Sequence, residues 1–169
     1  MSSWYVWLNL SLNTLAIASL MAMVTLGLTL IFGIMRIMNF AHGALYMLGA
    51  YTGISAAQWV GNFWIGLIAA PLVVGLLGAV FEYGLLRRLY HRDGGSFLLI
   101  TFGLSLVISE ATRLIWGPRP HDVQLPELLA GVVSMGDEPY PAYRVFLIAF
   151  GLVVLGSLLL VTWNIDRLL

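Results

Sequence analysis

Long runs of apolar residues, broken by short clusters of charge, dominate this chain. The first charged side chain is Arg36, and charge-free runs then cover 37–81, 94–109 and 145–165, with only His42 as an ionisable interruption. A helix needs about 20 mostly apolar residues to cross a bilayer. The pattern therefore predicts five membrane-spanning helices, at residues 11–35, 41–60, 65–86, 96–115 and 145–164.

The run 37–81 is long enough for two of these helices, and the polar pair Gly61 and Asn62 is the natural turn between them. Backbone groups cannot stay unpaired in hydrocarbon, so we expect the apolar runs to be helical. A membrane β-barrel would need strands of alternating polarity, which continuous apolar runs do not provide. The expected fold is all-α: a polytopic transmembrane helix bundle, formed by one domain over residues 1–169.

The segment 117–143 is the one sizeable polar piece between the predicted helices. Its three prolines, Pro118, Pro120 and Pro126, exclude a helix through its first part. Further on, the apolar run 132–135 is followed by a turn-like sequence, which is typical of a small β-hairpin. An irregular loop is the alternative for the same residues.

The arginines of the predicted loops predict how the chain is oriented. Loops rich in arginine and lysine stay on the cytoplasmic side. With five spans, one side of the membrane receives the arginines of two loops and of the chain end: Arg36, Arg87, Arg88, Arg92 and Arg167. The N-terminus is therefore expected outside, the segment 117–143 outside and the C-terminus in the cytoplasm. The first apolar run has no preceding positive charge, so we expect a permanent span rather than a cleaved signal.

The composition supports a membrane protein and excludes several other classes. Hydrophobic residues make up 60% of the 169 residues and charged residues 9%, against about 25% charged residues in soluble domains. This is too little polar surface for a soluble enzyme, a disordered tail or a nucleic-acid binder. The formal net charge is zero and cysteine is absent, so neither attraction to nucleic acid nor a thiolate metal site is expected.

A polar break between the first two predicted helices is the most informative stretch. Asn39 and His42 lie there between two strongly apolar runs, close to Arg36. Polar groups at membrane depth usually face a bundle interior or a watery cavity, so the break could line a transport pathway or a subunit contact. Alternatively it is a cytoplasmic turn in which Asn39 caps the second helix. His42 alone is not a metal site, because no second ligand lies at helical spacing.

Small residues recur every fourth position along the second predicted helix. Such a face lets two helix backbones approach closely, although it does not say which helix is the partner. The residues of this predicted packing face are Gly49, Gly53, Ala57 and Gly61.

Two charged residues, Glu110 and Arg113, lie three positions apart near the end of the fourth predicted helix. They share a helix face, so we expect an intramembrane charge pair, with a pathway role as the alternative. No catalytic constellation, phosphate-binding loop or cofactor motif is found in the sequence. A membrane-embedded enzyme using His42 and Glu110 is disfavoured, because these residues lie near opposite membrane faces.

Two ordered motifs give the chain a family resemblance. The first is the run 27–51, with Asn39-Phe40-Ala41-His42-Gly43 and Tyr46-Met47-Leu48-Gly49 at its core. The second is Ile100-Thr101-Phe102-Gly103-Leu104-Ser105, leading to Trp116-Gly117. Both closely resemble the permeases of branched-chain amino acid ABC transporters, of the LivH type.

The resemblance implies an inner-membrane pore subunit of a bacterial importer for leucine, isoleucine and valine, with urea or short amides as alternative substrates. The implied partners are a second permease subunit, cytoplasmic ATP-binding subunits and a periplasmic substrate-binding protein; no cofactor is implied. The residues expected to line a pathway or gate are Asn39, Phe40, His42, Gly43 and Tyr46, with Gly43 allowing close helix approach.

The family continues past this point with a cytoplasmic loop that docks on the ATPase, whereas this sequence ends at Leu169. The resemblance therefore implies a chain truncated before that coupling loop. Part of a split gene, half of a pore completed by another chain and a truncated, non-transporting membrane scaffold are the alternatives that follow from this departure.

Overall fold

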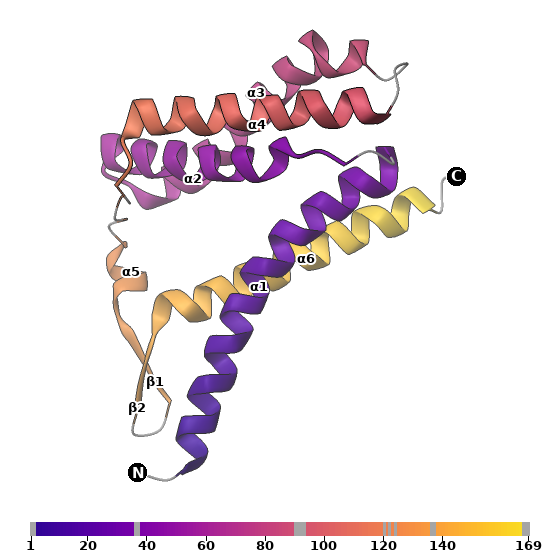
Figure 1. Cartoon of the computed structure of the whole chain (residues 1–169). Helices are drawn as coiled ribbons and strands as arrows, with labels where there is room; N and C mark the ends of the chain where they lie inside the picture. The colour runs from indigo at the N-terminus through magenta and orange to yellow at the C-terminus, as the bar shows by residue number, and fades with distance from the viewer. Residues whose placement is uncertain are drawn as a thin grey trace. The chain divides into compact units, whose positions relative to one another are not determined.

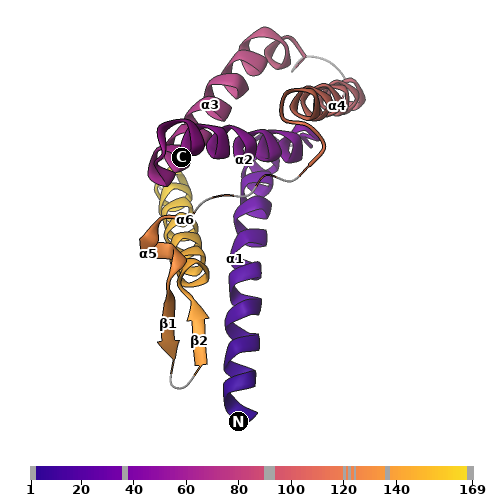
Figure 2. The ribbon, with the colours of Figure 1, turned by 90° about the vertical axis from the view of Figure 1, so that its left-hand side faces the viewer.

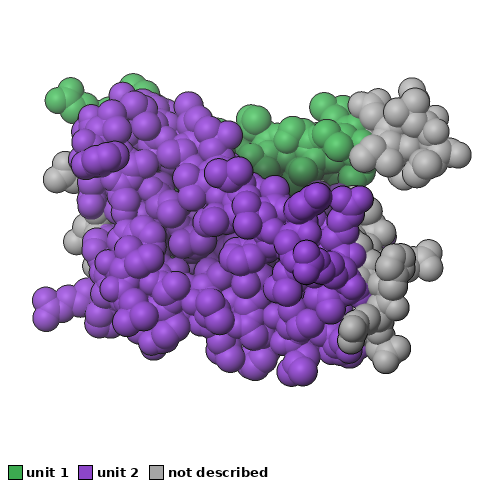
Figure 3. All heavy atoms as spheres, turned by 90° about the horizontal axis from the view of Figure 1, so that it is seen from above, with its two compact units in different colours: residues 1–27, 125–169 green, residues 28–124 purple. Residues whose placement is uncertain are grey.

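A computed structural model describes residues 3–35, 38–89, 94–119, 121, 123, 125–135 and 138–166. The chain divides into two compact units, residues 1–27 with 125–169 (unit 1) and residues 28–124 (unit 2), coloured separately in Figure 3. Each unit is described by itself below.

Five long helices, two short helical segments and one β-hairpin make up the described residues (Figure 1). In chain order they are α1 (Ser3–Met35), α2 (Ala41–Val60), α3 (Phe63–Gly84), η1 (Leu86–Arg88), α4 (Gly94–Trp116), α5 (Glu127–Ala130), β1 (Val132–Met135), β2 (Glu138–Pro141) and α6 (Ala142–Asp166). All five predicted segments are thus helical and the all-α class is confirmed, with most ends within three residues of the prediction. The exception is α1, which begins at Ser3 rather than near residue 11, because neither charge nor proline interrupts the sequence there.

Four of the helices are long and apolar enough to cross a membrane. These segments are Val6–Gly33, Phe63–Arg88, Gly95–Trp116 and Ala142–Trp163. Helix α2 has 20 residues but is less apolar, because it carries polar residues such as Thr52, Ser55 and Gln58. Large apolar side chains are exposed on these helices: Leu72 is 67% exposed and Leu76 69%. This is expected where lipid rather than protein covers the surface. The chain is a multi-pass membrane protein.

In unit 2, α2 contacts both α3 and α4 (Figure 2). The turn between α2 and α3 forms at the predicted pair. Gly61 adopts a left-handed conformation with φ +71°, which glycine reaches without the steric cost of a Cβ, and its N–H donates to the Ala57 carbonyl. Asn62 then caps α3, since its side-chain oxygen accepts from the Trp64 N–H at 2.9 Å.

In unit 1, the predicted hairpin is confirmed as an antiparallel pair of β1 and β2, with Val133 opposite Tyr140. Of the four residues expected in its turn, Gly136 and Asp137 lie outside the described residues, whereas Glu138 and Pro139 belong to β2 and pair with Met135 and Ser134. The Tyr140 side chain is buried, and its hydroxyl donates to the Asn13 side-chain oxygen of α1 at 3.4 Å. Arg144, in the first turn of α6, donates to the same oxygen. These bonds hold the hairpin and the start of α6 against α1.

Candidate functional site

The polar break lies directly before α2, and the side chain of Asn39, one residue before the N-cap position Phe40, bonds the first N–H of the helix. Its Oδ1 accepts from the Ala41 N–H at 2.9 Å, and its carbonyl oxygen accepts from the His42 N–H at 3.3 Å. This is the capping bond expected if the break is a turn. The bond uses only the side-chain oxygen, so a pathway role for the Asn39 amide stays a prediction. Arg36 and Ile37 lie outside the described residues.

Helix α4 holds the same break in place. The Phe40 N–H donates to Thr101 Oγ1 at 3.4 Å, and the Thr101 side chain is fully buried. The rings of Phe40 and Phe102 meet edge to face, with centroids 6.3 Å apart. The two motifs that carry the family resemblance therefore meet in space. Sequence reasoning identified both motifs, but it did not single out Thr101, and no signal in one sequence pairs it with Phe40.

A hollow with a volume of about 280 Å³ lies beside the break. Apolar side chains from the end of α1 and from the break form most of its wall. Its lining residues, all in unit 2, are Leu28, Thr29, Phe32, Met38, Asn39 and Phe40. Asn39 is thus the one amide among mostly apolar neighbours, and sequence reasoning had not placed the residues of α1 beside it.

The other residues of the predicted pathway lie on the first turns of α2. His42 is half-buried, whereas Gly43 is exposed and Tyr46 is 57% exposed. Ala41 and Ala44 are buried on a different face of the same turns. The close helix approach expected at Gly43 is not made to any described residue, because a Cβ there would meet no atom within 4 Å. The structure therefore brings Asn39 and Phe40 to the hollow, but not Gly43 or Tyr46.

The small-residue face of α2 packs on α3, which settles the partner that the pattern left open. A Cβ on Gly66 of α3 would overlap the Gly53 carbonyl oxygen and lie 2.7 Å from the Ala57 Cβ. A Cβ on Gly53 would lie 3.1 Å from the Ala70 Cβ. Gly61 does not continue this face: a Cβ there would meet nothing within 4 Å, because the residue forms the turn after α2.

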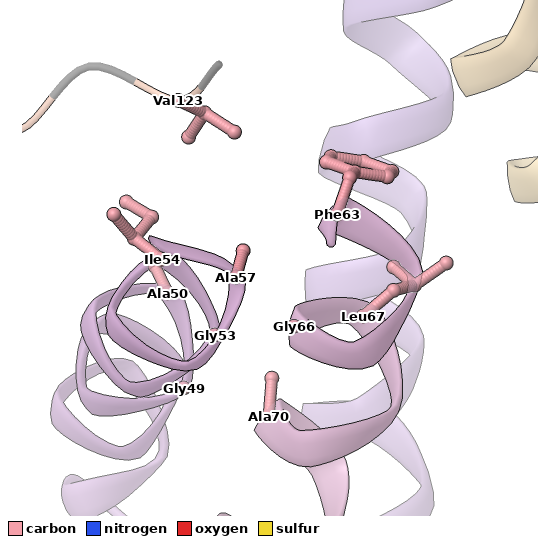
Figure 4. Close-up of a pocket in the computed structure, with 10 residues that line it drawn as sticks. All are labelled: Gly49, Ala50, Gly53, Ile54, Ala57, Phe63, Gly66, Leu67, Ala70 and Val123. Atoms are coloured by element: carbon pink, nitrogen blue, oxygen red, sulfur yellow. The ribbon is translucent and has the colours of Figure 1, made fainter. Parts of the chain in front are cut away.

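Beside this contact lies a second hollow of about 180 Å³. Figure 4 shows it between α2 and α3, with Ile54 and Phe63 on its two sides and Val123 close by. All ten lining residues are apolar or glycine. We therefore assign it to helix packing rather than to the recognition of a polar ligand.

The predicted pair of Glu110 and Arg113 is present near the end of α4. Arg113 Nη1 lies 3.4 Å from Glu110 Oε2, and the side chains of Arg113 and Glu110 are 64% and 61% exposed. One turn further, Trp116 Nε1 donates to Ser55 Oγ of α2 at 2.6 Å. The depth of the charge pair in the membrane stays a prediction. Within the described ranges, no group of three or more histidine, cysteine or acidic residues could hold a metal ion.

Substituting Thr101 by valine tests the contact between α4 and the break. Valine keeps the size of threonine but removes the oxygen that accepts from the Phe40 N–H, which costs about 1 kcal/mol for a lost neutral hydrogen bond. We expect Thr101→Val to lower the thermal stability of the detergent-purified protein by a few degrees, whereas Thr162→Val should change it less. Among the described residues, Thr162 Oγ1 bonds the Leu158 and Leu159 carbonyls of its own helix. Equal shifts for both variants would contradict a bracing role of Thr101.

The fold and the two meeting motifs define a polytopic α-helical membrane protein with a capped break inside a helix bundle. Residues 10–163 match the model of the family described as the permease component of branched-chain amino acid transport systems. The chain belongs to this family.

Curated relatives agree with the match. The chain is 27% identical to the branched-chain amino acid permease protein BraD of Pseudomonas aeruginosa over 94% of its own length and 56% of the relative's. It is 29% identical to the permease proteins LivH of Salmonella typhimurium and of Escherichia coli, over 73% of this chain and 42% of each relative. The chain thus spans about half the length of the curated relatives it matches. No solved structure matches it.

Proposed function

We propose that this chain is a transmembrane permease subunit of an ABC importer for leucine, isoleucine and valine. The observation that carries the proposal is the family match over residues 10–163, because it includes both motifs that meet at Phe40 and Thr101. The relatives' names give the substrate class: all three are called branched-chain amino acid transport permeases.

The chain would work with a second permease subunit, cytoplasmic ATP-binding subunits and a periplasmic substrate-binding protein. Transport would follow from alternating access of the helix bundle, and the partner subunits would hydrolyse ATP. The chain itself would not be an enzyme. Because it spans about half the length of its relatives, we propose that further transmembrane segments complete the pore.

We place the protein in the bacterial inner membrane with the N-terminus outside and the C-terminus in the cytoplasm. Arg87 and Arg88, which follow α3, then lie on the cytoplasmic side, as the positive-inside rule requires. The hairpin of β1 and β2 lies outside, where a periplasmic binding protein would dock.

Within this topology, the stretch of Asn39, Phe40, His42, Gly43 and Tyr46 would line the pathway or its gate. The break connects α1 with α2, and its contact with α4 fixes its position. A short connection of this kind can act as a hinge, because a few residues in it absorb the φ/ψ changes of a conformational switch. Gly43 and Tyr46, which face away from the buried side of α2, would then meet the segments that complete the pore.

Uptake by the assembled transporter tests the proposal. The chain is expressed with the remaining subunits of its transporter in bacterial cells that lack their own branched-chain amino acid permeases. We expect uptake of radiolabelled leucine that excess isoleucine or valine competes away. If the chain is present in the membrane but leucine uptake stays at the level of cells without it, the importer function is contradicted and a non-transporting scaffold is favoured. Uptake of urea or acetamide without leucine would contradict the substrate class.

A further inference from the structure

The hollow beside the break combines an apolar wall with a single amide. Leu28, Phe32 and Met38 supply apolar surface, and each stays between 40% and 55% exposed. Pockets for small ligands are mostly apolar, with a few placed polar groups that fix orientation. At about 280 Å³ the hollow is slightly smaller than the ~300 Å³ at which the size range of such pockets begins. It therefore suits a small, largely aliphatic ligand.

The side chain of Asn39 has hydrogen-bonding capacity left over. Its oxygen bonds the Ala41 N–H, and this bond fixes which side of the amide turns away from the helix start. An asparagine amide carries two further N–H donors. Across the described ranges, no acceptor takes a hydrogen bond from Asn39 Nδ2. No fully buried side-chain nitrogen or oxygen in these ranges lacks a hydrogen-bond partner. Nδ2 is therefore unpaired among the described residues without being fully buried, so its two donors are left for a ligand.

A comparison with the α2–α3 hollow shows what the amide adds. That hollow has no polar side chain in its wall, so it could hold an acyl chain or a helix side chain but not the head of an amino acid. The hollow at the break has the Asn39 amide and the Thr29 hydroxyl. A ligand with one aliphatic part and one anionic part fits only the second of these environments.

We propose that the hollow lined by Leu28, Phe32, Met38 and Asn39 is a substrate subsite for one branched-chain amino acid. The aliphatic side chain of the substrate packs on Leu28, Phe32 and Met38. Its carboxylate accepts a hydrogen bond from Asn39 Nδ2, a charge-assisted bond that is stronger than a neutral one. Asn39 is thus both the cap of α2 and a specificity-determining residue. This inference rests on the proposed function, because it names the substrate contacts of that permease.

Asn39→Asp separates the two roles of Asn39. Aspartate keeps the side-chain oxygen that caps α2, since aspartate and asparagine cap equally well, but it loses the amide donors and repels a carboxylate. Asn62→Asp is the matched control, because Asn62 caps α3 through the same bond and lies outside the hollow. We expect Asn39→Asp to raise the KM for leucine at least about tenfold at neutral pH, the effect of losing one hydrogen bond to a charged group. Asn62→Asp should leave KM unchanged.

A labelling experiment tests the site without requiring transport. The chain has no cysteine, so Met38→Cys introduces a single thiol at the wall of the hollow while Asn39 stays in place. In the purified transporter, we expect leucine to slow the reaction of this thiol with a maleimide several-fold, and D-glucose not to slow it. Equal labelling with and without leucine would overturn the subsite, as would be seen if a lipid chain or a partner helix filled the hollow.

The two experiments distinguish failure of the subsite from failure of the function. If the wild-type transporter takes up leucine but Asn39→Asp keeps the wild-type KM, the subsite is wrong and the permease function stands. If the wild-type transporter does not take up leucine, the proposed function itself is wrong.

Discussion

Substituting Gly66 by leucine is expected to remove most of the folded protein from the membrane. Already the first carbon of a side chain at Gly66 would overlap the Gly53 carbonyl oxygen and lie 2.7 Å from the Ala57 Cβ. Both neighbours belong to the α2 helix, and neither is a flexible side-chain end. The helices would have to separate to make room, and inserting such a side chain costs about 1–3 kcal/mol or more. Membrane abundance and thermal unfolding in detergent would measure the loss.

Gly75→Leu provides the matched control for this substitution. Gly75 lies on the same helix, two and a half turns further along, and a Cβ there would meet nothing within 4 Å. We expect wild-type abundance and a melting temperature close to that of the wild type. If Gly75→Leu were as damaging as Gly66→Leu, the loss would reflect the apolar volume added to α3 and not the close contact with α2.

The loss expected for Gly66→Leu is large because α2 and α3 pack in lipid rather than in water. Lipid tails are as apolar as leucine, so burial of apolar surface does not hold two helices together in a bilayer. Their association depends on close van der Waals contact, which the small side chains of Gly53, Ala57 and Gly66 permit. In unit 1, α1 and α6 meet in the same way, since a Cβ on Gly151 would lie 2.8 Å from the Ser19 Cβ.

The positions of the helices were predictable because lipid imposes one strong rule on the sequence. An apolar run of sufficient length must pair its own backbone groups, so runs without charge became helices. The turn at Gly61 and Asn62 was also predictable, since a left-handed glycine followed by a capping asparagine is a local feature. The hairpin of unit 1 needed only its turn chemistry and the apolar run of β1.

The partners of each helix were not predictable in this way. Small residues on α2 indicated a close contact but not its partner helix, and only the geometry shows that Gly66 faces Gly53. Thr101 reads as an ordinary polar residue in an apolar helix until its oxygen is seen to accept from the Phe40 N–H. The hollow depends on where α1 ends relative to the break, which no local pattern encodes.

Helix α2 determines on which sides of the membrane the two ends of the chain lie. Four other segments are apolar enough to cross, so the chain has an odd number of spans only if α2 crosses as well. Its polar side chains weaken its preference for lipid, but they have partners inside the protein. Thr52 donates to the Gly49 carbonyl at 3.1 Å, and Ser55 accepts from Trp116 at 2.6 Å. Paired polar groups cost less at membrane depth, so we expect α2 to cross.

Labelling of the two ends of the chain in intact cells tests this account most directly. Since the sequence contains no cysteine, Ser3→Cys and Asp166→Cys each introduce a single thiol. A membrane-impermeant maleimide is expected to label Ser3→Cys in intact cells with the outer membrane opened, and Asp166→Cys only after the inner membrane is permeabilised. Labelling of both variants before permeabilisation, or of neither, would place both ends on one side and contradict the five-span permease.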